Sequence, residues 1–408
     1  MKNNWKFYKL GELIEYKKGY AFKSTDYQDT GVRIIRVSDT TYNSIKDQDS
    51  IFISKEKASL YSNHELLEND LIVSTVGSRP PLYDSMVGKV IKVPKFYEGT
   101  LLNQNAVRLR SKASVNQFFL YSNLKTRRYV YHIESSIRGN ANQASITLED
   151  LFSFEIQLPP KKEQDKIASI LSAWDEAIEL KENLIEQKKE WKKGLIQKLL
   201  TGKVRLPEFN ESWRTYKLYE LVEFKKGKGL SKDKVSNRGK YKCILYGELY
   251  TKYNEVIGTI NSYVDEKDGI VSEENDVLIP ASTTTNALDL ATASAVKDKG
   301  IFLGGDINIL RQKKGVYINE FLAYYLKHIK KKEMAAIGQG TTIIHLYGKD
   351  LKNIEIRLPS VGEQKAIATI LSKADQEIGF LQEQLLNIKE QKKGLLQLLL
   401  TGEVQVNV

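Results

Sequence analysis

The feature that most constrains this chain is that much of it is written twice. The segment from Leu158 to Val204 recurs from Leu358 to Val404, 200 positions later and without a gap, and roughly half of the aligned positions are identical. A second repeat, at an offset of 208, relates Trp5 through Gly19 to Trp213 through Gly227. Such a duplication predicts two equivalent halves, each made of a globular lobe followed by the repeated segment.

The repeated segment has the pattern of a long amphipathic helix. Apolar residues recur at intervals of three and four, and each copy begins near a Glu-Gln pair and ends at Thr-Gly. A helix of about forty residues is about 60 Å long, and its narrow apolar stripe has to be covered. We expect the two copies to cover each other as an antiparallel coiled coil. The alternative is that each helix packs only on its own lobe.

The lobes have the pattern of short strands bounded by turns, for example at 70–74 and 106–110 in the first lobe and at 276–279 and 307–310 in the second. A helical stretch follows in each lobe, at 116–128 and 319–332. Scattered identities survive between the lobes, pairing Asp70 with Asp276 and Arg110 with Arg311.

Together these patterns predict an α+β fold with two pseudo-symmetric globular domains separated by two long antiparallel conserved helices. The expected boundaries are a first globular domain over 1–160, a first helix over 161–202, a linker over 203–212, a second globular domain over 213–360, and a second helix with its tail over 361–408.

The charge of the chain is concentrated in the lobes. The net charge is +11, but the two repeated segments, 161–203 and 361–403, contribute only +2 and −1. A basic surface on the lobes favours a polyanion partner.

Composition argues against disulfides, metal sites and membranes. The single cysteine, Cys243, and four scattered histidines give no Cys/His ligand pattern. No apolar stretch is long enough to span a bilayer, and the start MKNNWKFYKL has no signal-peptide core. We expect a cytoplasmic protein with no membrane partner and no bound metal.

Two polar loops recur in equivalent places of the lobes. One is rich in Gly, Asn, Gln and Thr and covers 137–143 and 337–342; the other is rich in Ser and Thr and covers 74–79 and 282–286. Asn, Gln and Arg side chains hydrogen-bond base edges and phosphates, although polar turns are also common without a ligand. With the basic strand ends, the candidate DNA-contacting residues are Lys17, Lys18, Ser78, Arg79, Arg138, Asn140, Asn142, Gln143, Lys225, Lys226, Lys228, Thr283, Thr284, Thr285, Gln339, Thr341 and Thr342.

Catalytic motifs are missing from the sequence. It contains no phosphate-binding glycine loop and no Asn/Asp-Pro-Pro-aromatic motif of an adenine methyltransferase. Glu15-Tyr16-Lys17 and Glu223-Phe224-Lys225 suggest a magnesium-dependent nuclease only weakly, because no Pro-Asp precedes them at strand spacing. We interpret both as alternating strands, and expect no catalytic residue and no cofactor.

At this point the layout and several motifs resemble the specificity subunits of type I restriction-modification systems. The motifs are the opening Trp5-x-x-x-x-Leu10-Gly11-Glu12-Leu13, the segment Gly19-x-Ala21-Phe22-Lys23-Ser24, the segment Cys243 to Tyr250, and both Leu-Pro-x-x-x-Glu-Gln helices ending in Leu-Thr-Gly. The resemblance covers essentially the whole chain.

The resemblance implies a non-catalytic subunit that binds double-stranded DNA through two target recognition domains, one for each half of a bipartite asymmetric site. It also implies two partner modification subunits, which bind S-adenosylmethionine and methylate adenine, and restriction subunits that use ATP and Mg²⁺. The alternative from another class is a protein-binding scaffold whose basic lobes dock an acidic partner.

If the helices separate the two reading lobes, their length sets the spacing between the half-sites. Inserting four residues after Lys192, about one helical turn or 6 Å, is expected to lengthen the spacer by about one or two base pairs. Sequencing of methylated DNA measures this spacer directly. A spacer that stays unchanged would contradict the ruler hypothesis.

Overall fold

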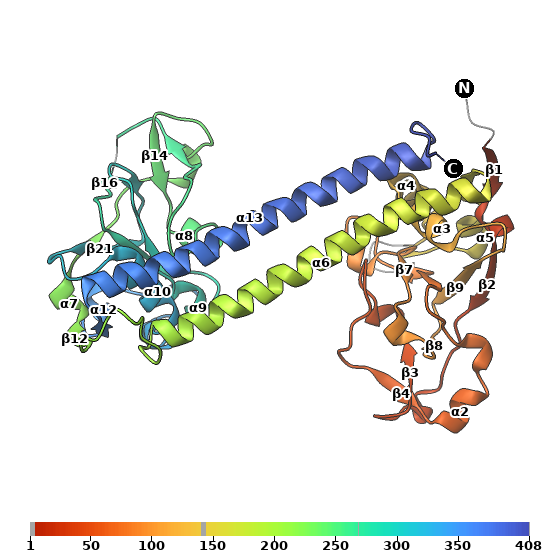
Figure 1. Ribbon diagram of the computed structural model, residues 1–408, viewed down its shortest axis with the longest axis horizontal. Coiled ribbons are helices and arrows are strands. Elements are labelled where there is room, and N and C mark those ends of the chain that lie inside the picture. Colours follow the sequence, from red (N-terminus) through yellow and green to blue (C-terminus); the bar gives the residue numbers. More distant parts are fainter. Residues whose placement is uncertain (1–4, 140–143, 268, 408) are drawn as a thin grey trace. The chain divides into compact units, whose positions relative to one another are not determined.

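The computed structural model describes residues 5–139, 144–267 and 269–407. Over these residues the chain forms two compact units (Figure 1). The first unit contains residues up to 182 together with those from 384 onward, and the second contains 183–383. Each unit therefore holds one lobe and one half of each long helix. Because the units divide both helices, the expected domain boundaries stay a prediction.

The first lobe is built from short elements. They are β1 (Lys6–Lys9), α1 (Leu10–Leu13), β2 (Ile14–Lys18), β3 (Val32–Ile35), β4 (Ile51–Ile53), α2 (Lys55–Ser59), β5 (Leu71–Ser74), β6 (Val76–Gly77), β7 (Val90–Lys92), β8 (Leu101–Leu102), β9 (Ala106–Ser111), α3 (Gln117–Asn123), α4 (Arg127–Ser136), β10 (Ala144–Ser145), α5 (Leu148–Phe152) and β11 (Glu155–Leu158).

The second lobe repeats this order with insertions. Its elements are β12 (Arg214–Lys217), α7 (Leu218–Leu221), β13 (Val222–Lys226), β14 (Tyr241–Ile244), α8 (Glu248–Thr251), β15 (Tyr263–Val264), β16 (Ile270–Val271), β17 (Val277–Pro280), β18 (Ser282–Thr283), α9 (Ala287–Leu290), β19 (Ser294–Ala295), β20 (Phe302–Leu303), β21 (Ile307–Gln312), α10 (Asn319–His328), α11 (Lys331–Ile337), β22 (Ile344–His345), α12 (Gly348–Leu351) and β23 (Glu355–Leu358).

The central sheet has the same topology in the two lobes, whereas the smaller sheet has three strands, β4-β3-β8, in the first lobe and four, β15-β14-β20-β16, in the second. A four-stranded antiparallel sheet has the order β2-β9-β5-β7 in the first lobe and β13-β21-β17-β19 in the second. The first strand of each lobe pairs with the last, β1 with β11 and β12 with β23, so the chain enters and leaves each lobe at one place. The expected pseudo-symmetric α+β lobes are confirmed.

The residues that are identical in the two lobes, Asp70 with Asp276 and Arg110 with Arg311, form the same buried ion pair in each lobe. Arg110 Nε lies 2.6 Å from Asp70 Oδ1, and Arg311 Nη2 lies 2.9 Å from Asp276 Oδ2. Both carboxylates are buried, and the hydrogen bond to Asp70 or Asp276 raises the pKa of its arginine. A buried charge is stable only when it is paired. The two positions of this ion pair therefore tolerate little change, although the surfaces of the two lobes differ.

The helical stretch expected at 116–128 is two helices rather than one. Thr126 interrupts it, because its Oγ1 accepts a hydrogen bond from Tyr129 N at 3.2 Å and so begins α4 as an N-cap. The second lobe is divided in the same place, between α10 and α11.

The long helices are α6 (Lys161–Leu199) and α13 (Val361–Leu400). In the first unit the start of α6 runs antiparallel to the end of α13: Asp175 pairs with Lys392, and Lys389 Nζ lies 2.6 Å from Glu182 Oε1. The second unit has the mirrored pairs, Lys192 with Asp375 and Lys188 with Glu377. The expected antiparallel pairing is confirmed within each unit (Figure 1).

Each helix ends inside a lobe core. Leu199 and Leu200 belong to the apolar core of the second lobe, and Leu399 and Leu400 belong to that of the first. Within the described residues, no helix is long and apolar enough to cross a membrane.

Candidate nucleic-acid interface

The structure joins the two polar loops of the first lobe. β6 pairs with β10, placing Gly77 opposite Ala144, and Arg79 Nη2 donates a hydrogen bond to Gly139 O at 3.1 Å. Arg138 is exposed and lies 3.1 Å from Asp150 Oδ2. Two segments that are about sixty residues apart in sequence therefore form one edge of the lobe.

The second lobe joins its loops in the same way. β18 pairs with β22, placing Ser282 opposite His345, and His345 is also bridged to Gln339 on its other side. Gln339, Thr341 and Thr342 are exposed at this edge.

The basic strand ends lie next to these loops. In the second lobe Lys226 Nζ is 3.5 Å from Asp306 Oδ1, and Ser282 donates a hydrogen bond to the other oxygen of the same carboxylate. In the first lobe the loop 103–106 bridges the two parts: Gly19 N donates to Ala106 O, and Thr75 N donates to Asn105 O. Lys17, Lys18, Lys225 and Lys228 lie on the same strands or directly after them.

Not every predicted residue is available at this edge. Thr283 is only 1% exposed, and its Oγ1 lies 2.8 Å from that of Thr285, which in turn donates to Asp289. Thr283 was therefore wrongly assigned to the surface: it shapes the turn, whereas Thr284 and Thr285 are exposed.

Two other assignments have local roles or lie elsewhere. Ser78 Oγ accepts a hydrogen bond from Ser85 Oγ at 2.9 Å, which fixes the loop that carries Arg79. Asn140, Asn142 and Gln143 lie outside the described residues.

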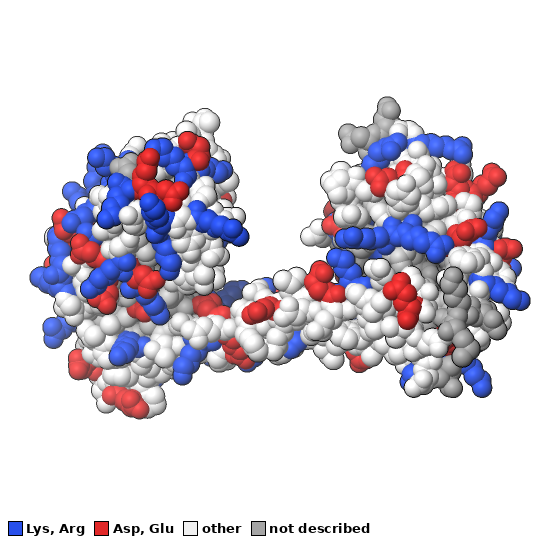
Figure 2. Space-filling view, turned by 90° about the horizontal axis from the view of Figure 1, so that it is seen from above, with Lys and Arg blue, Asp and Glu red and all other residues white. Residues whose placement is uncertain are grey.

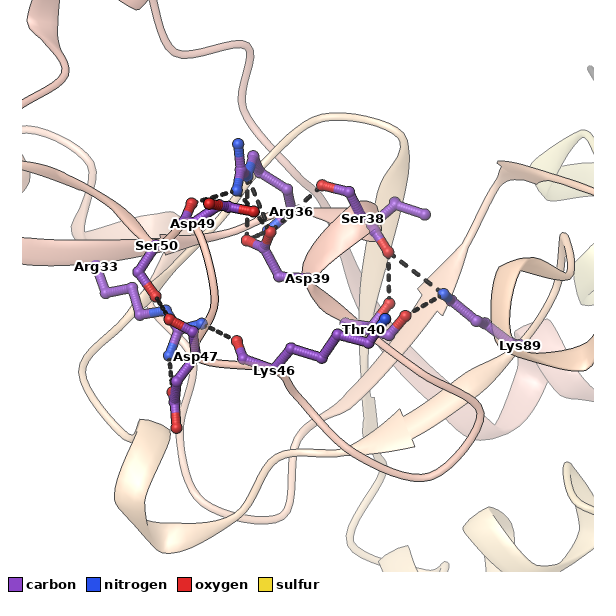
Figure 3. A network of polar contacts seen from close by, with 11 residues as sticks. Arg33, Arg36, Ser38, Asp39, Thr40, Lys46, Asp47, Asp49, Ser50 and Lys89 are labelled. Atoms are coloured by element: carbon purple, nitrogen blue, oxygen red, sulfur yellow. Dashed lines mark hydrogen bonds and ion pairs between the residues drawn. The ribbon is translucent and has the colours of Figure 1, made fainter. Parts of the chain in front are cut away.

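A polar network that the sequence did not reveal fixes the loop between β3 and β4 (Figure 3). Lys89, which is 1% exposed, donates hydrogen bonds to the carbonyl oxygens of Thr40 and Asp84, both at 2.6 Å. Burial lowers the pKa of the Lys89 amine to about 8. Arg36 holds Asp39 from the other side, at 2.8 Å between Nη2 and Oδ1. The buried Lys89 amine thus satisfies the carbonyl oxygens of Val37 and Thr40 in this loop.

The tip of that loop reaches the end of α3. Lys125 Nζ donates to Tyr42 O at 2.5 Å and lies 3.9 Å from the centre of the Tyr42 ring. Burial lowers the pKa of Lys125 to about 7, although the Asp175 carboxylate on α6 opposes the shift. The loop and the end of α3 therefore meet around one amine in the first unit, and the Asp175 carboxylate on α6 acts on that amine electrostatically.

The second unit has an acidic centre at the equivalent junction. Glu255, 3% exposed, lies 2.5 Å from His328 Nε2 and 3.6 Å from Lys192 Nζ on α6. Burial alone would raise the pKa of Glu255, but the hydrogen bond from His328 and the charges of Lys327 and Lys192 hold it well below its ordinary value. In the second unit an ion pair therefore joins the lobe to α6, and in the first unit the Lys125 amine and the Asp175 carboxylate attract each other.

Basic side chains gather on the surfaces of the lobes. Figure 2 shows one face, where Lys and Arg are numerous on the lobe at the left and form separate groups on the lobe at the right, with acidic residues among them. Across 5–139, 144–267 and 269–407, no group of three or more His, Cys, Asp or Glu side chains could hold a metal ion. The Glu-x-Lys pairs lie on β2 and β13 as alternating strand residues, with Glu15 opposite Arg110 and Glu223 opposite Arg311.

Comparison with known proteins identifies this arrangement. The family model of the type I restriction modification DNA specificity domain matches residues 2–189 and again 210–390. The chain belongs to the type I restriction-modification DNA specificity family. The two lobes are its target recognition domains, and the chain is a DNA-recognition subunit rather than a catalytic one.

Individual relatives agree over nearly the full length. The MjaVIII specificity subunit of a type I restriction enzyme of Methanocaldococcus jannaschii is 26% identical over 99% of this chain and 93% of its own. Among solved structures, the S subunit of the type I system of M. genitalium matches with a TM-score of 0.64 at 19% identity, covering 100% of this chain and 97% of that one. A chain from a study of complex assembly in a type I system matches with a TM-score of 0.56 at 18% identity, over 98% of each chain.

These comparisons favour the specificity subunit over the protein-binding scaffold. They do not test the individual DNA-contacting residues, which remain predictions.

The basic strand end gives a test that separates phosphate contact from base reading. Lys226→Ala is expected to weaken binding to every duplex by roughly three- to tenfold and to lower the slope of log affinity against log salt by about 1. Lys314→Ala, an exposed lysine elsewhere in the same lobe, is the matched control. Fluorescence anisotropy across a salt series measures both quantities, and an affinity equal to the control on all duplexes would refute the assignment.

Proposed function

We propose that this specificity subunit reads a bipartite, asymmetric site in double-stranded DNA, with one half-site for each lobe. It directs two modification subunits to methylate adenine in that site, and restriction subunits to cleave DNA that lacks the methylation. It works in the cytoplasm, and S-adenosylmethionine, ATP and Mg²⁺ belong to the partner subunits.

The observation that carries this proposal is the paired loop edge of each lobe. Both lobes bring the same two distant loops together through the same pairing, β6 with β10 and β18 with β22. The side chains at these edges nevertheless differ: the first lobe presents Arg79 and Arg138, and the second presents Thr284, Gln339 and Thr341. Equivalent edges with different side chains are what two unlike half-sites require.

The helix pair supports the ruler hypothesis. Asp175 with Lys392 and Asp375 with Lys192 are the same pair in the two copies, 200 positions apart. These charges set the register of the helices. An insertion after Lys192 alone lengthens α6 but not α13, so the sharper form of the variant adds a second insertion after Lys392 at the equivalent position of α13.

Sequencing of methylated bases tests the central proposal. We expect a host that expresses this chain with a cognate modification subunit to carry methylated adenine in one split motif, and the motif to disappear when the chain is omitted. Single-molecule sequencing gives both half-sites and the spacer. Methylation that is absent, or that does not depend on the chain, would contradict the proposal.

The partner surface is proposed from two exposed apolar residues. Leu180 on α6 is 62% exposed and Phe380 on α13 is 59% exposed, and they occupy equivalent positions of the two repeats. Neither residue is covered within its own unit. Two equivalent apolar positions, one in each unit, fit two copies of one partner subunit.

A charge placed at either position is expected to remove one partner. Leu180→Glu or Phe380→Glu is expected to change the complex from two modification subunits per specificity subunit to one, because a carboxylate opposes burial in an apolar contact. Native mass spectrometry measures this stoichiometry. Gln197→Glu and Gln397→Glu, at exposed equivalent positions, are the controls, and unchanged stoichiometry in the apolar variants would place the docking surface elsewhere.

A further inference from the structure

Three side chains of the second lobe, the half-buried His345 and the exposed Tyr347 and Lys349, form a column beside the paired loops. The rings of His345 and Tyr347 are stacked, with centroids 5.6 Å apart and planes 10° apart. Lys349 Nζ lies 5.5 Å from the centre of the Tyr347 ring. We call His345, Tyr347 and Lys349 the lobe-2 column.

The backbone that carries the column is held from several sides. His345 is bonded to Gln339 in both directions, N to O at 2.7 Å and O to N at 2.9 Å, and lies opposite Ser282 in β18. Between the two rings, Leu346 is fully buried, and its carbonyl oxygen accepts a hydrogen bond from Asn308 Nδ2. Since alternate residues of an extended segment point to opposite sides, burial of Leu346 fixes both rings on the outer side.

The first lobe has different side chains at the same positions. At an offset of 200, Ser145, Thr147 and Glu149 replace the column, and Ser145 has the equivalent pairing with Arg138. The backbone is thus common to both lobes, and only the outward chemistry changes, from small polar and acidic groups to stacked aromatic rings and a cation.

With the column in place, the second lobe lacks hydrogen bonds that the first lobe makes at the equivalent positions. Thr147 caps α5, accepting from Asp150 N at 3.1 Å and donating to Asp150 Oδ2 at 2.6 Å. Tyr347 begins α12 without a side-chain cap, and Asp350 Oδ2 is buried with no hydrogen-bond partner among the described residues. Ser, Thr, Asp and Asn are the favoured residues at a helix N-cap, so Tyr347 does not serve its own helix.

A shallow surface hollow of about 550 Å³ lies next to Lys349 and is lined by Gln339, Lys349, Asp350 and Lys352. Tyr347 is 39% exposed and His345 is half-buried, so both rings have surface that is open to a partner. Both side chains donate and accept hydrogen bonds, and stacking on each other leaves these rings few rotamers to lose on binding.

We propose that the lobe-2 column is a specificity-determining element of the second half-site: His345 and Tyr347 contact base edges in the duplex, and Lys349 contacts the adjoining phosphate. This inference rests on the proposed function, since it names the side chains by which one lobe reads its half-site. The first lobe reads its own half-site without such a column, through the arginines at the equivalent edge.

The test transfers the first lobe's residues to the second. The triple variant His345→Ser, Tyr347→Thr, Lys349→Glu is compared with the wild-type chain and with Tyr219→Thr, Lys314→Glu, which changes an exposed tyrosine and an exposed lysine elsewhere in the lobe. Each chain is expressed with the cognate modification subunit, and methylated adenine is mapped by single-molecule sequencing.

We expect the triple variant to keep the first half-site and the spacer but to relax or change at least one base of the second half-site, with methylation of the original motif falling by roughly five- to a hundredfold. If the triple variant methylates the unchanged wild-type motif to the same extent as the control variant, the proposed role of the column is refuted. If the triple variant is unstable, Tyr347→Phe provides the test, because it keeps the ring and removes only the hydroxyl. Relaxed recognition of a base in the second half-site supports the proposed role of the column. Full methylation of an unaltered motif refutes it.

Failure of the proposed function gives a different result. If the wild-type chain directs no methylation, both the proposed function and the proposed role of the column are refuted. If the wild-type chain yields a split motif that the column variants leave unaltered, only the column is refuted.

Discussion

The geometry of each unit depends on one buried glutamine at the start of each long helix. Gln164 accepts a hydrogen bond from Asn116 N at 2.9 Å and donates to Pro159 O at 2.8 Å. Gln364 makes the same two contacts, with Ile318 N and Pro359 O, both at 2.9 Å. Both side chains are buried, and an amide lost at such a site leaves buried donors and acceptors unpaired. The direction in which a helix leaves its lobe is therefore fixed by one amide, and the repeat preserves that amide twice.

The lobes combine an internal scaffold that both share with surfaces that differ between them. Asp70 with Arg110 and Asp276 with Arg311 hold the central sheets by the same buried pair. The junctions with the helix pair are less alike, because one centres on the half-buried amine of Lys125 and the other on the buried carboxylate of Glu255. Both lobes place a charged side chain at the junction with the helix pair. That side chain is basic in the first lobe and acidic in the second.

This contrast explains what could be predicted from the sequence. The repeat, the period of the helices and the Glu-Gln and Thr-Gly boundaries are local patterns, and they led to the helix pair that the structure contains. That the two polar loops of each lobe meet in space was not predicted, because the sequence shows that each loop recurs but not that β6 pairs with β10 and β18 with β22. Burial of Thr283 was missed, since a turn of three threonines reads as exposed in sequence. The column was missed because His345, Tyr347 and Lys349 gain meaning only from their stacking and from their counterparts 200 positions earlier.

The end of α13 in the core of the first lobe has a consequence for synthesis of the chain. Leu399 and Leu400 are buried in the same core as Leu10 and Leu71, so the first lobe leaves the ribosome long before the residues that complete it. At a synthesis rate of about 5–20 residues per second, the apolar surface that these leucines cover waits for some tens of seconds. During that interval the first copy of the helix, with Leu199 and Leu200 at the equivalent positions, is the segment already available to cover it.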